Sequence, residues 1–356
     1  MLSEIRNEKN REPIRTAVVG YGLSGKIFHT PFLSVNSNFS LDYIVTSDAG
    51  RMADAAREYP DALIIESYQK LATFFSELDL IVLATPPDTH VEQGLAALGA
   101  GLALVIDKPF APSVDEAEQL ISLAKAKSLP VMVFQNRRWD GDFLTLSSLL
   151  NDRRLGEVVR FESNFEHYSP IAKERWKDQL PASQGGGITF DLGSHLIDQA
   201  VQLFGPVKES HADIYTLRKG AGNDDYSEID LIHKSNVHSH LTASRVANQP
   251  KPRFRVTGTG GTFVSYGLDS QEPTLAAGVK PNDPKFGAAG ESQECSLFTL
   301  SNPNVSIETI PMKVGSYVSF YEGVAHAVRG EGPSPVDASE ALYVVQVIES
   351  LFQKVK

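Results

Sequence analysis

The segment from Gly185 to His195 contains two side chains that can exchange protons. Asp191 and His195 stand four residues apart, so they share one face if a helix begins near Asp191. An imidazole has an unperturbed pKa near neutrality and can act as a general acid or base. The carboxylate can orient that ring or meet a ligand hydroxyl itself. The same spacing equally fits a helix N-cap followed by an ordinary helical histidine, so spacing alone leaves both interpretations open.

Lys108 is a third candidate, because it follows the apolar run Leu102–Ile106 and precedes Pro109. Ligands of open α/β sheets bind at the carboxyl ends of the strands. A partly buried lysine at such a point can hold a reacting hydroxyl oxygen and lower its pKa. The alternative is a surface lysine at a strand end, which is where most lysines are found. Sequence does not decide whether the bond before Pro109 is cis or trans.

A glycine pattern follows the first apolar run of the chain. Arg15–Val19 leads into the six residues 20–25, which read G-Y-G-L-S-G, a G-x-G-x-x-G motif between a strand and a helix. In that context Gly20 allows the tight turn, Gly22 lets a pyrophosphate approach the backbone, and Gly25 lets helix and strand pack closely. The N–H groups at the helix start attract phosphates. An ordinary glycine-rich turn is the alternative. The residues predicted to bind a dinucleotide here are Gly20, Gly22, Leu23, Ser24 and Gly25.

The end of the second strand distinguishes NAD from NADP. An acid at this point would bond the ribose hydroxyls and repel a 2′-phosphate. Here Thr46 and Ser47 occupy the point, and Arg51 follows within reach of a phosphate. Asp48 lies slightly later and is the alternative ribose acid. The pattern favours NADP as the cofactor, with NAD as the alternative.

Composition and charge limit the classes of partner. The chain has 356 residues, with 33 basic and 44 acidic side chains, a net charge of −11 that argues against nucleic-acid binding. Cys295 is the only cysteine and the histidines are scattered, so we expect neither a disulfide nor a metal. Met1–Pro13 is polar, and Leu95–Ile106 is too short to cross a bilayer. We expect a soluble, cytoplasmic protein with a small-molecule ligand and no membrane partner.

Alternating strand and helix patterns must position the candidate residues. The run Ile81–Ala84 is apolar throughout, which is typical of a parallel strand covered on both faces. Ser113 and Glu116 form a capping box at the start of an intervening helix. We predict a Rossmann domain of class α/β over residues 14–135, after a disordered tail over residues 1–13. The strand-like runs are Arg15–Val19, Leu41–Thr46, Asp79–Ala84, Leu102–Ile106 and Pro130–Phe134.

The pattern changes in the second half of the chain. Helices are expected over Asp142–Leu150 and after Gly187, whereas Asp269–Glu294 is rich in Gly and Pro and is predicted to be a long loop. Strand-like segments without helical spacing between them are Lys208–Leu217, Ser227–His233, His238–Val246, Phe254–Gly258 and Thr262–Tyr266. We predict an α+β substrate and oligomerisation domain over residues 136–336, with a large, mostly antiparallel open sheet. A C-terminal helix over residues 337–356, capped by Asp337, would pack back on the body. An apolar open sheet face would pair with another subunit in a homodimer or homotetramer.

Four motifs in this order resemble the Gfo/Idh/MocA oxidoreductases over nearly the whole chain from Ile14. They are Thr85-Pro86-Pro87-Asp88-Thr89-His90, Asp107-Lys108-Pro109, Gln135-Asn136-Arg137-Arg138-Trp139-Asp140, and the segment Gly185–His195, which reads G-G-G-I-T-F-D-L-G-S-H. The segments 21–29 and 136–140 look most like the NADP-dependent scyllo-inositol dehydrogenase branch, as do Gly315-Ser316-Tyr317 and Phe320-Tyr321. Two residues depart from the pattern: Gln135 stands where relatives commonly have His, and Asp107 replaces Glu.

The resemblance implies a dehydrogenase that moves a hydride between a nicotinamide cofactor and a polyol or sugar carbon, with scyllo-inositol and its ketone as the best match. The implied catalytic residues are Lys108, Asp191 and His195. Further cofactor contacts are implied, in addition to those on residues 20–25 and 46–51: Thr85, Pro86, His90, Lys108 and Asn136. The implied substrate contacts are Lys108, Arg137, Tyr168, Asp191 and His195. His90 fits a helix cap as well, and Arg138 with Asp140 fits a hinge ion pair. A non-catalytic NADP-binding sensor and a reductase of a non-sugar carbonyl remain the alternatives.

Overall fold

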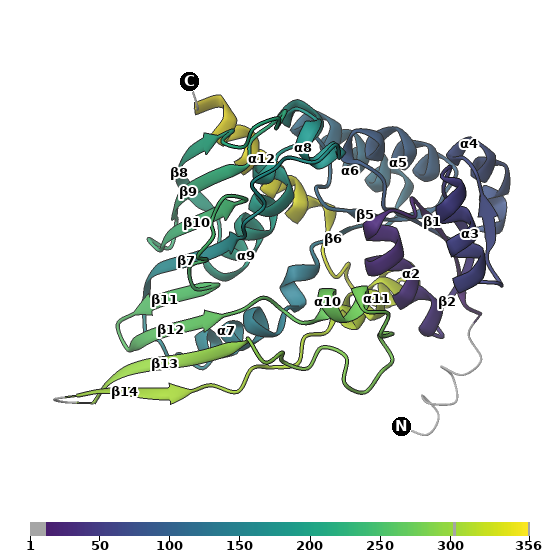
Figure 1. Ribbon diagram of the computed structural model, residues 1–356. Helices are drawn as coiled ribbons and strands as arrows, with labels where there is room; N and C mark the ends of the chain where they lie inside the picture. The colour runs from purple at the N-terminus through teal and green to yellow at the C-terminus, as the bar shows by residue number, and fades with distance from the viewer. Residues whose placement is uncertain (1–11, 302–303, 355–356) are drawn as a thin grey trace.

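The computed structural model describes residues 12–301 and 304–354, which form two sheets with helices around them (Figure 1). Residues 1–11 of the predicted tail lie outside the described residues. A parallel sheet comes first along the chain and a mostly antiparallel one follows. The predicted fold class is therefore confirmed.

The first sheet has the strand order β3-β2-β1-β4-β5-β6, and all of its pairs are parallel. Its strands are β1 (Ile14–Val19), β2 (Phe39–Val45), β3 (Leu63–Ile65), β4 (Leu80–Leu83), β5 (Ala103–Asp107) and β6 (Val131–Phe134). The intervening helices are α2 (Thr30–Val35), α3 (Ala49–Glu58), α4 (Tyr68–Leu71), α5 (His90–Gly99) and α6 (Val114–Lys127). All four residues of β4 are buried, as a strand covered on both faces requires. β3 was not predicted, because three residues are too few to form a recognisable run.

The strands of this sheet end in register at one edge. Val19 pairs with Val45 on one side and with Leu83 on the other, and Leu83 pairs with Ile106. The turns that follow β1, β2, β4 and β5 therefore lie side by side. This edge collects residues from four separate parts of the sequence, and it is where an open parallel sheet binds ligands.

The second sheet has the order β14-β13-β12-β11-β7-β10-β9-β8. Its strands are β7 (Val158–Glu166), β8 (Val207–Tyr215), β9 (Tyr226–His233), β10 (His238–Ser244), β11 (Phe254–Gly258), β12 (Gly261–Tyr266), β13 (Glu294–Ser301) and β14 (Asn304–Thr309). Every pair is antiparallel except β10 with β7. Five of these strands match predicted segments. β7 and β13 were not predicted, and β14 is exposed along its length, so it has no buried face to produce an alternating pattern.

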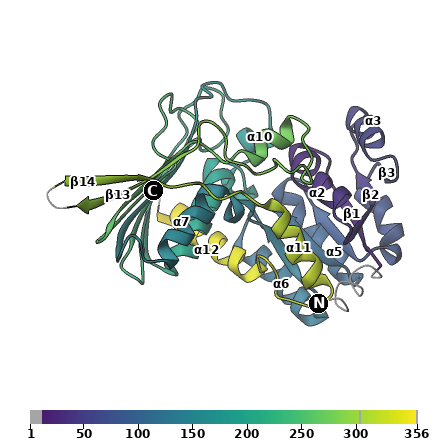
Figure 2. The same ribbon diagram turned by 90° about the horizontal axis from the view of Figure 1, so that it is seen from below.

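Helices cover only one face of the second sheet (Figure 2). They are α7 (Gly141–Asn151), α9 (Ser194–Phe204) and α12 (Ala338–Lys354), and their apolar side chains share a core with the inner face of the strands. On the other face the central strands carry charged residues such as Arg160, Glu162 and Asp230. The most exposed apolar side chains on that face lie at the β13–β14 end, where Leu300 and Ile307 are 78% and 65% exposed. The expected apolar open face is thus most pronounced at one end of the sheet.

Two segments of the second half pack into the core of the first sheet. Tyr321, on α11 (Tyr317–Val328), lies in one apolar cluster with Phe32 and Phe134. The predicted loop Asp269–Glu294 contains a short helix, α10 (Gln271–Ala276), whose Leu275 joins the same cluster. In space, therefore, the stretch predicted as one substrate domain contributes to both cores.

The C-terminal helix α12 begins one residue after the predicted cap, and Asp337 Oδ1 accepts a hydrogen bond from Ser339 N at 2.9 Å. On this helix Ala341, Val345 and Ile348 are buried. Ala341 and Val345 join the core of the first sheet, whereas Ile348 joins that of the second. This helix therefore packs against both sheets.

Candidate active site

The glycine turn after β1 has the shape that a dinucleotide pyrophosphate needs. Gly20 has a φ of +98°, and a Cβ on Gly25 would lie 1.8 Å from the carbonyl oxygen of Gly20, so neither position accepts a side chain. A Cβ on Gly22 would meet only Arg51, at 3.8 Å, so the backbone is open to a ligand there. Ser24 Oγ is buried without a hydrogen-bond partner among the described residues. The turn therefore offers both space and an unused donor, which fits the predicted cofactor.

The residues after β2 lie beside this turn. Asp48 caps α3, with its Oδ1 accepting a hydrogen bond from Arg51 N at 2.8 Å. Thr46 is buried and Ser47 is exposed. The Arg51 guanidinium reaches toward Gly22, as the 3.8 Å approach above indicates. The acid is engaged as a helix cap, whereas the arginine side chain lies next to the phosphate-binding turn.

The turn after β4 is held together by its own hydrogen bonds. Thr85 Oγ1 donates to Gln93 Oε1 at 3.0 Å and accepts from Thr89 Oγ1 at 2.8 Å. His90 is fully buried, and its two ring nitrogens face the carbonyl oxygens of Thr85, at 2.9 Å, and Phe110, at 3.3 Å. Its ring thus joins the turns after β4 and β5. We therefore expect His90 to position those turns, whereas Thr85 and the partly buried Pro86 keep surface for a cofactor.

Lys108 and Asp191 meet at the carboxyl end of β5. Lys108 Nζ donates to the backbone oxygen of Asp191 at 2.7 Å and to its Oδ1 at 3.0 Å. The Lys108–Pro109 bond is cis. Burial lowers the pKa of Lys108, although the Asp191 charge opposes that shift. The structure thus joins two of the three predicted catalytic residues, which lie 83 positions apart in the sequence.

Two further cations bind the same carboxylate. Lys177, on the short helix α8 (Trp176–Gln179), donates to Asp191 Oδ1 at 2.7 Å, and Arg245, just after β10, donates to Oδ2 at 2.8 Å. Burial alone would raise the pKa of Asp191, but Lys108, Lys177 and Arg245 outweigh it and hold that pKa well below its usual range. Lys177 and Arg245 were not predicted from the sequence. Neither lies in a motif.

Asp191 and His195 are brought close by an irregular helix start. Asp191 lies in a π-helical turn, Thr189–Gly193, that runs directly into α9, and Asp224 Oδ2 caps the turn by accepting from Thr189 N at 2.8 Å and Oγ1 at 2.7 Å. His195 Nδ1 is hydrogen-bonded to Gln135 Oε1 at 3.1 Å. Among the described residues, therefore, Gln135 rather than Asp191 is hydrogen-bonded to the imidazole.

The environment of His195 keeps its ring uncharged. Burial is the largest cause that lowers its pKa, and the charges of Lys108 and Arg137 lower it further. The Asp191 carboxylate opposes this shift but does not overcome it. The pKa of His195 therefore lies well below its ordinary value. A neutral imidazole can accept a proton, which suits a general base.

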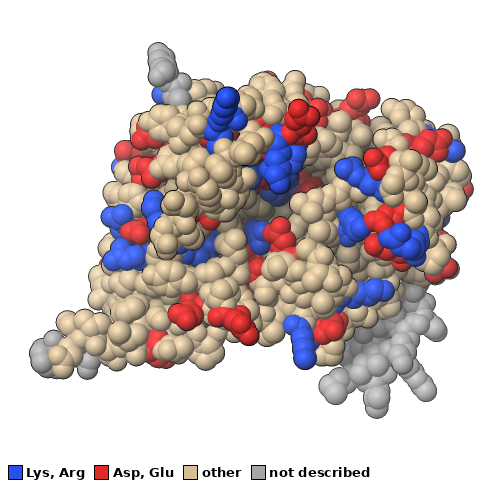
Figure 3. Space-filling model, viewed as in Figure 1, with Lys and Arg blue, Asp and Glu red and all other residues tan. Residues whose placement is uncertain are grey.

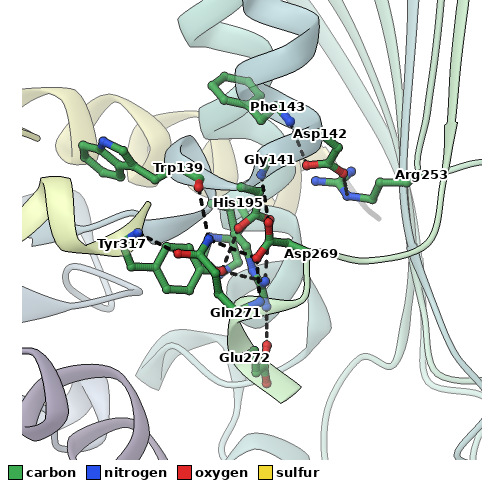
Figure 4. Close-up of polar contacts among 12 residues, drawn as sticks. Trp139, Gly141, Asp142, Phe143, His195, Arg253, Asp269, Gln271, Glu272 and Tyr317 are labelled. Atoms are coloured by element: carbon green, nitrogen blue, oxygen red, sulfur yellow. Dashed lines mark hydrogen bonds and ion pairs between the residues drawn. The ribbon is translucent and has the colours of Figure 1, made fainter. Parts of the chain in front are cut away.

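The residues that follow β6 form a buried polar network beneath His195 (Figure 4). Arg137 donates to the hydroxyl of Tyr317 at 3.0 Å and pairs with Glu272, and the same hydroxyl donates to Asp140 at 2.7 Å. Gln271 Oε1 accepts from Tyr317 N at 2.7 Å. Arg137 is thus held by protein groups, so we expect it to act on the site through its charge. The predicted cofactor contact Asn136 is buried at the start of this segment.

The expected ion pair between Arg138 and Asp140 does not form. Arg138 instead binds both carboxylate oxygens of Asp198, at 2.8 and 2.6 Å, and also pairs with Glu340 on α12. Asp140 instead pairs with Arg137 at 3.5 Å and accepts the hydrogen bond from Tyr317 described above. The geometry explains the difference, because Arg138 follows Arg137 on a short 3₁₀ turn and points toward α9.

The remaining predicted contact, Tyr168, lies at the rim with 59% of its surface exposed. Its neighbour His167 receives a hydrogen bond from Arg245 at 3.1 Å, and so connects the rim to the Asp191 cluster. Figure 3 shows a hollow near the middle of this face, with Lys, Arg, Asp and Glu side chains at its edges. The structure therefore gathers Lys108, Asp191 and His195 at one site and leaves Tyr168 at its border.

Within residues 12–301 and 304–354, no group of three or more His, Cys, Asp and Glu side chains is arranged to hold a metal ion. Over the same ranges, every helix is too short or too polar to cross a bilayer.

Two family profiles match the chain. The profile described as an oxidoreductase family with an NAD-binding Rossmann fold covers residues 14–135. The profile described as the GFO/IDH/MocA C-terminal domain covers residues 143–264. The first profile ends one residue after β6, where the parallel sheet ends.

Full-length relatives agree with these matches. A scyllo-inositol 2-dehydrogenase (NADP(+)) of Bacillus subtilis is 31% identical over 100% of this chain and 98% of its own length. An uncharacterised oxidoreductase of Escherichia coli is 36% identical over 94% of each. Among solved structures, an oxidoreductase of Bacillus subtilis superposes with a TM-score of 0.89 at 32% identity, covering 96% of each chain. The chain therefore belongs to the Gfo/Idh/MocA family of oxidoreductases.

Proposed function

We propose that the protein is an NADP-dependent dehydrogenase that moves a hydride to or from the CH–OH carbon of a cyclic polyol or sugar. The observation that carries the proposal is the convergence of Lys108, Asp191 and His195 at the same edge of the parallel sheet as the glycine turn. These groups supply a cation, an ionised acid and a neutral base within one partly enclosed site. That combination is what oxidation of an alcohol requires of a protein.

The nicotinamide, when bound, would accept or supply the hydride. Lys108 donates a hydrogen bond to the reacting oxygen and stabilises the negative charge that develops there. His195 takes the hydroxyl proton when the alcohol is oxidised and returns it when the ketone is reduced. Asp191 holds Lys108 in place through two hydrogen bonds and stays ionised because Lys177 and Arg245 bind its oxygens.

The choice of NADP rests on Arg51 and Asp48. Arg51 lies beside the glycine turn, whereas Asp48 is engaged as a helix cap and is less available to a ribose. Replacing Arg51 by alanine should weaken NADPH binding roughly 10- to 100-fold, since a charge-assisted hydrogen bond contributes about 1.5–3 kcal/mol. NADH binding should stay unchanged. Equal losses for both nucleotides would contradict a 2′-phosphate contact.

The substrate class is suggested by relatives at modest identity. Besides the scyllo-inositol 2-dehydrogenase reported above, a D-apiose dehydrogenase of Paraburkholderia graminis is 28% identical over 60% of this chain and 56% of its own length. Scyllo-inositol and its ketone are therefore the first compounds to test. Gln135 departs from the family pattern and contacts His195, so it is where a different substrate preference would be encoded.

The test is a fluorescence titration of the purified protein with NADPH and NADH, followed by scyllo-inosose and a panel of ketoses in the same cuvette. Tight NADPH binding, with a loss of fluorescence that depends on a ketose, is the expected result. Failure to bind either nucleotide would overturn the proposal.

Two alternatives give different outcomes in that experiment. A non-catalytic NADP-binding sensor would bind NADPH tightly and turn over no member of the panel. A reductase of a non-sugar carbonyl would consume NADPH only when simple ketones and aldehydes replace the sugars. The presence of both Lys108 and His195 favours the enzyme over the sensor, because a sensor needs neither.

We also propose that the chain works as a homodimer or homotetramer through the open face of the second sheet. The exposed apolar side chains Leu300, Val305 and Ile307 on β13 and β14 support this, since such a group is costly to leave in water. The charged central strands would then lie across from their counterparts on another subunit.

A further inference from the structure

Gln135 occupies a position where it can decide how His195 works. It follows β6 directly, is 2% exposed and places its Oε1 3.1 Å from His195 Nδ1. Its backbone is fixed on both sides, because its N–H donates to Val133 at 2.8 Å and its carbonyl accepts from Arg138 at 3.2 Å. The side chain therefore emerges from a rigid turn, and the imidazole is 3% exposed.

The chemistry of this contact selects one form of the ring. An amide oxygen only accepts hydrogen bonds, so His195 Nδ1 must carry a proton to pair with it. In a neutral imidazole the lone pair is then on Nε2. Among the described residues Nε2 makes no hydrogen bond, so it is free to meet a ligand. Because the proposed function assigns the proton transfer to His195, the reacting atom is decided by this one contact.

We propose that Gln135 is a positioning residue that holds His195 as the Nδ1–H tautomer, so that Nε2 is the atom that exchanges the proton with the substrate. The inference rests on the proposed function for that exchange, while the tautomer itself can be tested without a substrate. A neutral partner also distinguishes this site from one in which a carboxylate orients the histidine. An amide orients the ring without adding the negative charge that would stabilise an imidazolium.

The charges around His195 come from four elements. Lys108 at the end of β5, Arg137 after β6 and Lys177 on α8 disfavour a second proton on the ring. Asp191, on the π-helical turn before α9, favours it. On a fifth element, β7, the uncharged ring of Phe165 lies 6.3 Å away. With Gln135 neutral, these cations outnumber the anion three to one, which keeps the ring uncharged.

The test compares the wild type with Gln135→Glu, Gln135→Leu and Gln135→His. The first reports the effect of a charge, the second removes the acceptor, and the third restores an acceptor on a different side chain. Gln69→Glu, on the exposed surface, is the matched control for an added carboxylate. Nitrogen-15 NMR of the imidazoles, with the His195 signals assigned by their loss in His195→Gln, reads the tautomer directly. NADPH affinity and the melting temperature identify any variant that fails to fold.

In the wild type we expect a protonated Nδ1 and an unprotonated Nε2 at neutral pH, and mixed tautomers in Gln135→Leu. Gln135→Glu should move the titration of His195, and the acid limb of the kcat/KM profile for scyllo-inositol oxidation, up by about one to three pH units. Gln135→Leu should lower kcat by about tenfold to a hundredfold, as part of the total contribution of a general base. Gln135→His should recover part of that loss. Gln69→Glu should change none of these values.

An Nε2–H tautomer in the wild type, or a titration of His195 that Gln135→Glu and Gln135→Leu both leave unmoved, would overturn the inference. If Gln135→Glu does not fold, the comparison of Gln135→Leu with Gln135→His by NMR decides in its place. The expected tautomer without turnover of any polyol or sugar would support the role of Gln135 and overturn the proposed function instead. Turnover of a polyol or sugar, with the His195 NMR signals unchanged in every Gln135 variant, would support the proposed function and overturn the role of Gln135.

Discussion

Replacing Lys108 by methionine removes the ammonium group while keeping a side chain of similar length at the end of β5. In the wild type that group donates to the backbone oxygen and to Oδ1 of Asp191, at 2.7 and 3.0 Å. In the variant Asp191 keeps Lys177 and Arg245, so its carboxylate is still paired. We therefore expect the fold to lose only about 1–2 kcal/mol, which lowers the melting temperature by a few degrees.

The effect on catalysis should be much larger. Removing one preorganised donor to a developing oxyanion costs roughly 10²- to 10³-fold in kcat. The ammonium lies away from the glycine turn that would bind the phosphates, so NADPH affinity should stay near that of the wild type. Lys177→Met offers a comparison, because that ammonium binds the same oxygen of Asp191 but is proposed to meet no reacting atom. We expect it to lose no more than about tenfold in kcat.

The assay combines NADPH fluorescence titration, steady-state turnover with the substrate found in the panel, and thermal unfolding. Lys70→Met serves as the control, since Lys70 pairs with Glu66 on the exposed surface at 3.0 Å. Turnover by Lys108→Met above about a tenth of the wild-type rate would refute the assignment of Lys108. A loss of NADPH binding as large as the loss of turnover would refute the idea that the glycine turn binds the cofactor while Lys108 acts only in catalysis.

Three further predictions concern stability and assembly. Arg138→Met should lower the free energy of unfolding in urea by about 3–5 kcal/mol, because it leaves the buried carboxylate of Asp198 without its bidentate partner; a loss below about 1 kcal/mol would contradict this. Burial lowers the pKa of His29 to about 4, whereas the unfolded chain titrates near about 6.5. The unfolded state therefore binds more protons between those pH values. The free energy of unfolding should fall as the pH drops from about 6.5 to about 4, by up to about 1.4 kcal/mol per pH unit. Urea midpoints measured across this range should fall less steeply in His29→Asn than in the wild type. Ile307→Asp should shift the sedimentation of the protein toward the monomer, and an unchanged profile would argue against assembly through β14.

Much of the parallel sheet was predictable, because its strands are buried on both faces and appear as short apolar runs. The glycine turn was predictable for a related reason, since Gly20 and Gly25 occupy places that no side chain fits. β14 and β3 could not be predicted from runs of apolar residues. The residues of β14 are exposed on both faces, and β3 has only three residues. β7 was missed although it is central, because its apolar residues are interrupted by charged side chains on the open face.

The sequence by itself determined which chemistry was available and where the cofactor would bind, because motifs in a fixed order specify backbone turns and strand ends. Lys108, Asp191 and His195 were identified in this way. Only the tertiary structure decided how they interact. Lys177 and Arg245 reach Asp191 across 14 and 54 positions, and Gln135 reaches His195 across 60. Such contacts depend on how sheets and helices pack rather than on local sequence, and a charge that is ordinary on a surface acquires its effect only when burial removes the water around it.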